Sequence, residues 1–110
     1  MVMRISNIAL TPRAAPEFYR KRQAFRAGNG EVFALIWVSR YASANGASVP
    51  GFEPGYMCGP LYADGLSDAW LLATLPDGAQ FHFMPRGKWE PGKQYLVDRQ
   101  DFLFSIGPTA

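Results

Sequence analysis

The segment Val32–Val38 has the sequence VFALIWV and is apolar at all seven positions. β-Branched and aromatic side chains dominate it, glycines precede it at Gly28 and Gly30, and polar residues follow it. A short apolar run with such flanks is typical of a strand covered on both faces, because a half-solvated strand alternates apolar and polar residues. We therefore expect Val32–Val38 to be the middle strand of a sheet and the most buried element, with a helix as the less favoured interpretation.

Shorter strands are predicted on both sides of this segment. Asp68–Pro85 predicts a hairpin around the turn sequence LPDGA, in which proline, aspartate and glycine each favour a turn conformation. A short helix over Asp68–Leu75 is the alternative for the first half of that hairpin. Val2–Leu10 alternates loosely and predicts another strand. Gln94–Val97 and Phe102–Ile106 predict two more strands, or one strand with a bulge between them.

Pro16–Ala27 is the one helix candidate in the chain. Pro16 suits a first helical position, and Gly28 suits the position just after a helix. Two phenylalanines in the segment lie seven residues apart and would share one helix face. The helix is the favoured interpretation. The competing interpretation is a strand over Tyr19–Arg26 that turns at the following Gly-Asn-Gly sequence into the next strand.

The segment Ala42–Pro60 differs from the rest of the chain. Seven glycines and prolines interrupt it, so we expect a long irregular loop that is the most mobile or variable part of the domain. Its apolar side chains, Phe52 and Tyr56 among them, are too numerous for a purely solvated linker. They therefore either fold back over the core or contact a partner.

The composition indicates a single domain over all 110 residues. A hydrophobic fraction of 48% and an aromatic fraction of 15% exclude a wholly disordered chain, because disordered chains are poor in aromatic residues. No apolar run approaches the roughly 20 residues that span a bilayer, and no secretory signal is visible. Cys58 is the single cysteine, so no intramolecular disulfide can form. We expect a cytoplasmic protein with no membrane contact, and the residue usage indicates a bacterial or phage origin.

Charge is unevenly distributed along the chain, although the net charge is only +2. Residues 1–40 hold seven basic and two acidic residues, whereas residues 41–85 hold four acidic residues and no basic one. Four of the basic residues gather in one segment: Arg20, Lys21, Arg22 and Arg26. Such a cluster attracts phosphates, and interleaved aromatics can stack on bases. Nucleic-acid binding is therefore one alternative function, and the solvated outer face of a helix is the competing interpretation.

Residues able to carry out catalysis are scarce. Cys58 and His82 are the only thiol and the only imidazole, and a nucleophile needs a base within hydrogen-bond reach. The chain has no zinc-binding spacing, and its carboxylates show no pair suited to acid–base chemistry. We therefore predict no metal, no cofactor and no assigned catalytic residue. A small enzyme using Cys58 or His82 is the second alternative, against a structural role for both side chains.

The aromatic residues exceed what a small core needs. Phe52, Tyr56 and Trp89 lie in turn-rich stretches, so they are the aromatics least certain to be buried. Aromatic side chains are enriched among the residues that dominate protein interfaces. We therefore predict that these three residues bind a protein partner or a second copy of the chain, and burial in the core is the competing interpretation.

The sequence as a whole predicts an α+β, mainly β fold. We expect five to six short, mostly antiparallel strands that form a sandwich or a partly open barrel, with one short helix. The predicted function is that of a small non-enzymatic binding or accessory protein acting through protein–protein contacts, because catalytic groups are few while aromatics and turn-rich segments are plentiful.

Overall fold

The computed structural model describes residues 2–39 and 53–109. In chain order the described elements are β1 (Met3–Ile5), β2 (Ile8–Leu10), α1 (Ala15–Ala24), β3 (Glu31–Val38), β4 (Gly55–Tyr62), a short 3-10 helix (Ala63–Gly65), β5 (Leu71–Thr74), β6 (Gln80–Phe83), β7 (Tyr95–Gln100) and β8 (Leu103–Pro108). The fold is therefore mainly β with one α-helix, as predicted. The prediction of five to six strands is wrong, because the described residues form eight.

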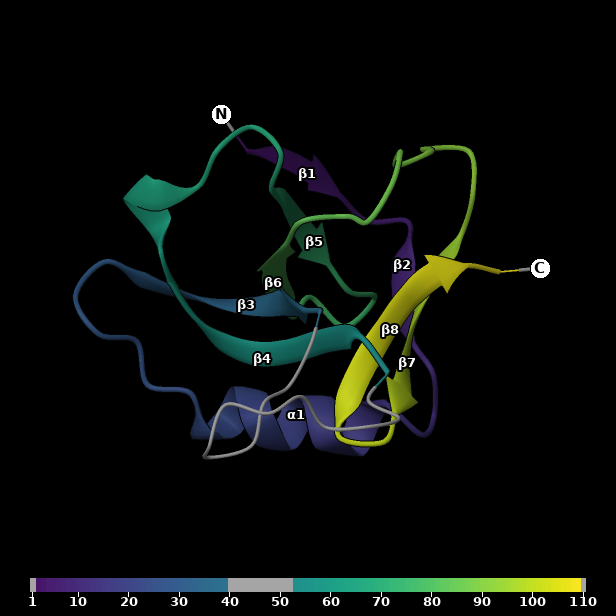
Figure 1. Ribbon diagram of the computed structural model, residues 1–110, viewed down its shortest axis with the longest axis horizontal. Coiled ribbons are helices and arrows are strands. Elements are labelled where there is room, and N and C mark those ends of the chain that lie inside the picture. Colours follow the sequence, from purple (N-terminus) through teal and green to yellow (C-terminus); the bar gives the residue numbers. More distant parts are fainter. Residues whose placement is uncertain (1, 40–52, 110) are drawn as a thin grey trace.

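All eight strands belong to one sheet with the order β1-β5-β6-β3-β4-β8-β7-β2. Its two end strands, β1 and β2, are separated in the chain only by Ser6 and Asn7. β1 runs parallel to β5 and β2 runs parallel to β7, so the chain steps from one sheet edge to the other within two residues. The sheet consequently curls into a nearly closed barrel (Figure 1). The single strand predicted over Val2–Leu10 is thus divided into two.

Asn7 fixes this step between the two sheet edges. Its Nδ2 donates to the backbone carbonyls of Glu90 and Lys93 at 3.2 and 2.7 Å, and its Oδ1 accepts from the indole Nε1 of Trp89 at 3.2 Å. Its backbone carbonyl accepts from the N–H of Tyr95 at 2.9 Å, where β7 begins. Because an amide side chain both donates and accepts, one residue ties the N-terminal step to the segment between β6 and β7.

β3 lies in the interior of the sheet, as predicted for the VFALIWV segment, with β6 on one side and β4 on the other. It pairs antiparallel with β4 over all eight residues of each strand. Phe33, Ala34 and Leu35 are buried, whereas the last three residues of β3 are half-buried. The described residues therefore cover the outer face of β3 only in part, which corrects the prediction of a strand covered on both faces.

The helix α1 packs against one end of the barrel interior, below β3 and β4 in Figure 1. Phe18 of α1 is fully buried. Its ring meets Phe33, Phe81 and Phe104 edge to face, with centroid distances of 5.7, 5.5 and 6.4 Å. Aromatic pairs prefer this arrangement over a face-to-face sandwich. One helical residue thus joins three strands in the centre of the core.

Most of the remaining predicted elements are present. The helix predicted over Pro16–Ala27 is confirmed, although α1 ends earlier because Phe25 is already extended, and the competing strand is wrong. The hairpin predicted within Asp68–Pro85 is formed by β5 and β6, so the alternative helix over Asp68–Leu75 is wrong. The last two predicted strands are β7 and β8, joined by a tight turn in which Asp101 has a φ of 55°.

The irregular loop predicted over Ala42–Pro60 is wrong at its C-terminal end. β4 begins at Gly55 and includes Pro60, residue types that the sequence pattern predicted to interrupt regular structure. Proline fits a strand where no neighbour needs its missing N–H, and β8 pairs with β4 only near the start of β4. The predictions that fall on residues 42–52, Phe52 included, lie outside the described residues.

Candidate functional site

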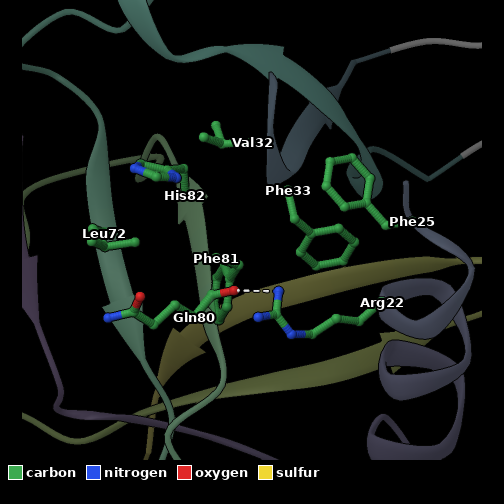
Figure 2. A pocket seen from close by; sticks show the side chains of 8 residues that line it. All are labelled: Arg22, Phe25, Val32, Phe33, Leu72, Gln80, Phe81 and His82. Atoms are coloured by element: carbon green, nitrogen blue, oxygen red, sulfur yellow. Dashed lines mark hydrogen bonds between the residues drawn. The ribbon is translucent and has the colours of Figure 1, made fainter. Parts of the chain in front are cut away.

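A cavity of about 430 Å³ opens where β3 and β6 diverge. The two strands run parallel, but their register contains only two residue pairs, Ala34 with His82 and Leu35 with Phe83. The beginnings of both strands are therefore left apart, and the end of α1 faces the gap (Figure 2). The residues that line the cavity, here called the β3–β6 pocket, are Arg22, Phe25, Val32, Phe33, Leu72, Gln80, Phe81 and His82.

Arg22 is the only permanently charged residue lining the β3–β6 pocket. Its Nη1 donates to the backbone carbonyl of Gln80 at 2.8 Å, a carbonyl just ahead of the pairing between β3 and β6. The guanidinium carbon lies 5.5 Å from the centroid of the Phe33 ring, within the range of a cation–π interaction. Arg22 forms no salt bridge with any carboxylate of the described residues. Its charge is therefore held beside aromatic rings with no carboxylate of residues 2–39 and 53–109 in salt-bridge contact.

His82 lies across the pocket from Arg22 (Figure 2). Burial lowers the pKa of its imidazole below the ordinary value, and a hydrogen bond with the Phe33 backbone opposes this shift to a smaller extent. The ring is therefore neutral at pH 7, with one nitrogen that donates and one that accepts a hydrogen bond. The pocket thus combines one fixed cation, one neutral imidazole, the amide of Gln80 and five apolar side chains.

The structure does not bring Cys58 and His82 together. Cys58 on β4 pairs with Leu35 of β3, and His82 on β6 pairs with the adjacent residue, Ala34. Adjacent residues of a strand point to opposite faces, and two strand spacings separate β4 from β6 by roughly 10 Å. Burial also raises the pKa of the Cys58 thiol to about 12. The thiol–imidazole pair considered for catalysis is therefore not assembled.

The predicted basic cluster is divided among several contacts. Arg20 forms a salt bridge with Glu17 at 2.5 Å, and Arg22 lies in the β3–β6 pocket. Arg26, which follows α1, donates from Nη1 to the backbone carbonyls of Gln23 and Phe25 at the end of that helix, at 2.6 and 3.0 Å. Lys21 is exposed. Three of the four basic side chains therefore contact other groups of the protein. Nucleic-acid binding by this cluster stays a prediction.

Two of the three predicted partner-binding aromatics, Tyr56 and Trp89, lie in the described part of the chain and pack against the core. Tyr56 is 2% exposed, and its hydroxyl donates to the backbone carbonyl of Met84 at 2.7 Å. Trp89 is half-buried and stacks on Tyr95 with ring centroids 3.7 Å apart. Both line a second cavity of about 200 Å³. Burial thus removes Tyr56 from the surface, and the partner-binding role of the set stays a prediction.

A row of small and apolar residues crosses the outer face of the sheet. Directly paired residues on neighbouring strands point to the same face, and one such row runs Leu72, His82, Ala34, Gly59 across β5, β6, β3 and β4, in which His82 is the one polar member. The pairs Val32 with Leu61 and Ile36 with Met57 flank this row on β3 and β4. Met84, directly after β6, is 37% exposed. We call the following set the outer apolar face: Val32, Ile36, Met57, Leu61, Leu72 and Met84.

Sequence reasoning missed both the pocket and the outer apolar face. The alternation around His82, with Phe81 and Phe83 on either side, was a usable signal that His82 faces outward. Met57 and Leu61 could not be placed without recognising β4. The pocket depends on how far two strands diverge, which no local pattern encodes.

Comparisons with models of protein families, with curated proteins and with solved structures find no match for this chain. Within the described part of the chain, no helix is both long and apolar enough to cross a membrane. The same residues hold no group of three histidine, cysteine or acidic side chains placed to share a metal ion.

Proposed function

We propose that this chain is a non-enzymatic binding module that recognises a protein partner through the outer apolar face. The observation that carries the proposal is the gathering of apolar side chains from β5, β3 and β4 on the side of the sheet away from the core, with His82 of β6 between Leu72 and Ala34. The inner face of the same strands already supplies the core through residues such as Phe33 and Phe81. The outer apolar side chains are therefore not needed to fill the barrel.

The exposure of this face supports a binding role. Met57 is 47% exposed, and Met84 is 37% exposed. Val32, Ile36 and Leu72 are half-buried. Scattered apolar residues are normal on a protein surface, whereas a contiguous apolar patch marks an interaction site. Methionine also adapts its shape to a partner because its side chain is unbranched and flexible.

The dimensions of the face favour a protein over a small molecule. Four neighbouring strands span roughly 15 Å between the outer two, because strands lie about 4.8 Å apart. A surface of this width suits a partner segment that contacts several side chains at once. Positive charge borders it, since Arg4 on β1 is aligned with Leu72 and Arg22 lies in the adjoining pocket. The partner that fits is an apolar segment flanked by acidic residues.

Capture experiments with two methionine variants test this proposal. Met57→Asp introduces a charge into the outer apolar face, and Met3→Asp makes the same change at an exposed methionine on β1. Wild type and Met3→Asp should capture the same protein from an extract of the source cells. Met57→Asp should bind the purified partner at least about tenfold more weakly, as expected for loss of an interface contact worth about 1.4 kcal/mol.

Three results would contradict the proposal. The first is the absence of any partner whose capture depends on Met57. The second is equal affinity of Met57→Asp and wild type for the captured partner. The third is a stable homodimer, measured by size-exclusion chromatography with light scattering, that Met57→Asp converts to monomer. That result would assign the face to a second copy of the chain instead.

Nucleic-acid binding through Arg20, Lys21, Arg22 and Arg26 is the alternative proposal. Its support is the exposure of Arg20, Lys21 and Arg26, and the contacts of the three arginines with protein groups weaken it. A salt-dependent gel shift separates it from the first proposal. Binding at low salt that is lost when all four residues are replaced by alanine would favour it.

A further inference from the structure

The β3–β6 pocket has the features of a binding site for a small ligand or for one residue of a larger one. Its volume of about 430 Å³ falls within the range of ligand pockets, which are mostly apolar with a few polar groups that fix orientation. Figure 2 shows the apolar side chains of Phe25 and Phe33 on one side of the cavity and Leu72 on the other. The cavity is open to solvent, and these side chains can contact an apolar body from two sides.

The charge in the pocket indicates which polar group a ligand bound there would carry. Arg22 is half-buried, and among residues 2–39 and 53–109 only one of its guanidinium donors is used, in the hydrogen bond to Gln80. Asp77 is close enough for its pKa to respond to Arg22, but its carboxylate is already occupied by the Tyr19 hydroxyl and the Ala79 N–H. A partly buried cation is stabilised by an anion that reaches it, and within the described residues the chain supplies none by salt bridge.

We infer that the β3–β6 pocket binds an apolar carboxylate. The free donors of Arg22 hold the carboxylate, whose two oxygens match the planar fork of a guanidinium. Phe25, Phe33 and Leu72 contact the apolar part, and His82 meets the far end of the ligand with a neutral imidazole. A phosphate fits less well, because a second negative charge would lie against aromatic rings with a single cation to balance it.

Two sources of this chemistry are a free aromatic acid and the C-terminal residue of a protein chain that ends in an apolar side chain. The inference does not rest on the proposed function, because it concerns the pocket and is tested with small probes. A failure of the Met57 experiment leaves it intact. A failure of the probe experiment likewise leaves the outer apolar face untouched.

A comparison of an acid with its amide on the unchanged protein is the first test. Titration calorimetry would measure 3-phenylpropanoate against 3-phenylpropanamide, which differ only in the charged group. We expect the acid to bind at least about tenfold more tightly, the ratio that corresponds to one charge-assisted hydrogen bond. The Arg22 Nε–Hε resonance should shift with the acid and not with the amide. Equal affinities, or no binding of either probe at millimolar concentration, would overturn the inference.

Variants and a peptide arm complete the experiment. Arg22→Gln should abolish the preference for the acid, whereas Arg26→Gln, on the same segment but outside the pocket, should retain it. If Arg22→Gln does not fold, the acid–amide comparison and the Arg22 resonance still decide the question. N-acetyl-Gly-Phe as free acid and as amide tests the peptide source. Tighter binding of the peptide acid assigns the pocket to a partner's C-terminus, tighter binding of 3-phenylpropanoate assigns it to a free acid, and either result supports the inference.

Discussion

Replacing Asn7 with alanine should destabilise the barrel, because Asn7 holds the step between β1 and β2 against the segment that precedes β7. The substitution removes the Nδ2 hydrogen bonds to Glu90 and Lys93 and the Oδ1 hydrogen bond from Trp89. Each is worth about 1 kcal/mol net, so the free energy of unfolding should fall by about 2–3 kcal/mol. For a domain of this size, that loss lowers the Tm by roughly 10 °C.

Thermal unfolding followed by circular dichroism, with urea denaturation as the second measurement, tests this magnitude. Asn29→Ala is the matched control, because Asn29 is an exposed residue of the turn before β3. The control should change stability by less than about 0.5 kcal/mol, as surface substitutions usually do. If Asn7→Ala and Asn29→Ala lower the Tm equally, Asn7 does not tie the two sheet edges to the β6–β7 segment.

Three further predictions concern the core and the titratable groups. Hydrogen bonds from Arg13 and Thr11 hold the pKa of Asp98 well below its ordinary value. That stabilisation is present at neutral pH and is lost as the pH falls through the folded-state pKa, so Asp98→Asn should have a lower Tm at pH 7 and the gap to wild type should narrow below about pH 4. Phe18→Ala should cost about 3–5 kcal/mol in urea unfolding, because the side chain is fully buried among three rings; a loss under about 1 kcal/mol would contradict the central position of Phe18. Cys58 should react slowly with a maleimide at pH 8 until denaturant is added, because burial raises the pKa of its thiol to about 12; labelling of the native protein at the unfolded rate would show that the thiol is accessible.

The local patterns predicted those elements whose signal lies within a few residues. The VFALIWV run identified β3, the LPDGA turn identified the β5–β6 hairpin, and Pro16 with Gly28 bracketed α1. β4 was missed because Gly55, Gly59 and Pro60 are poor strand formers in isolation. Eight residues of antiparallel pairing with β3 override that preference, and such pairing is a property of the tertiary fold.

The division of the N-terminal strand also escaped prediction, for a different physical reason. Nothing in the sequence around Ser6 and Asn7 shows that the two halves pair with β5 and β7, which are distant in the chain.

The candidate site was predicted still less well. The sequence predicts that Arg22 belongs to a basic cluster that binds nucleic acid or forms the solvated face of a helix, whereas the divergence of β3 and β6 places it in the wall of a pocket. Tyr56 was expected at the surface because it follows a turn-rich stretch, yet its pairing with Phe104 places it in the core.

Site-specific photo-crosslinking tests the proposed recognition surface most directly. A photoreactive phenylalanine derivative would replace Met57 in one protein and Met3 in another, and both proteins would be irradiated in extracts of the source cells. We expect one defined protein adduct from position 57 and none from position 3. An adduct of equal yield from both positions, or no protein adduct from position 57, would contradict recognition through the outer apolar face.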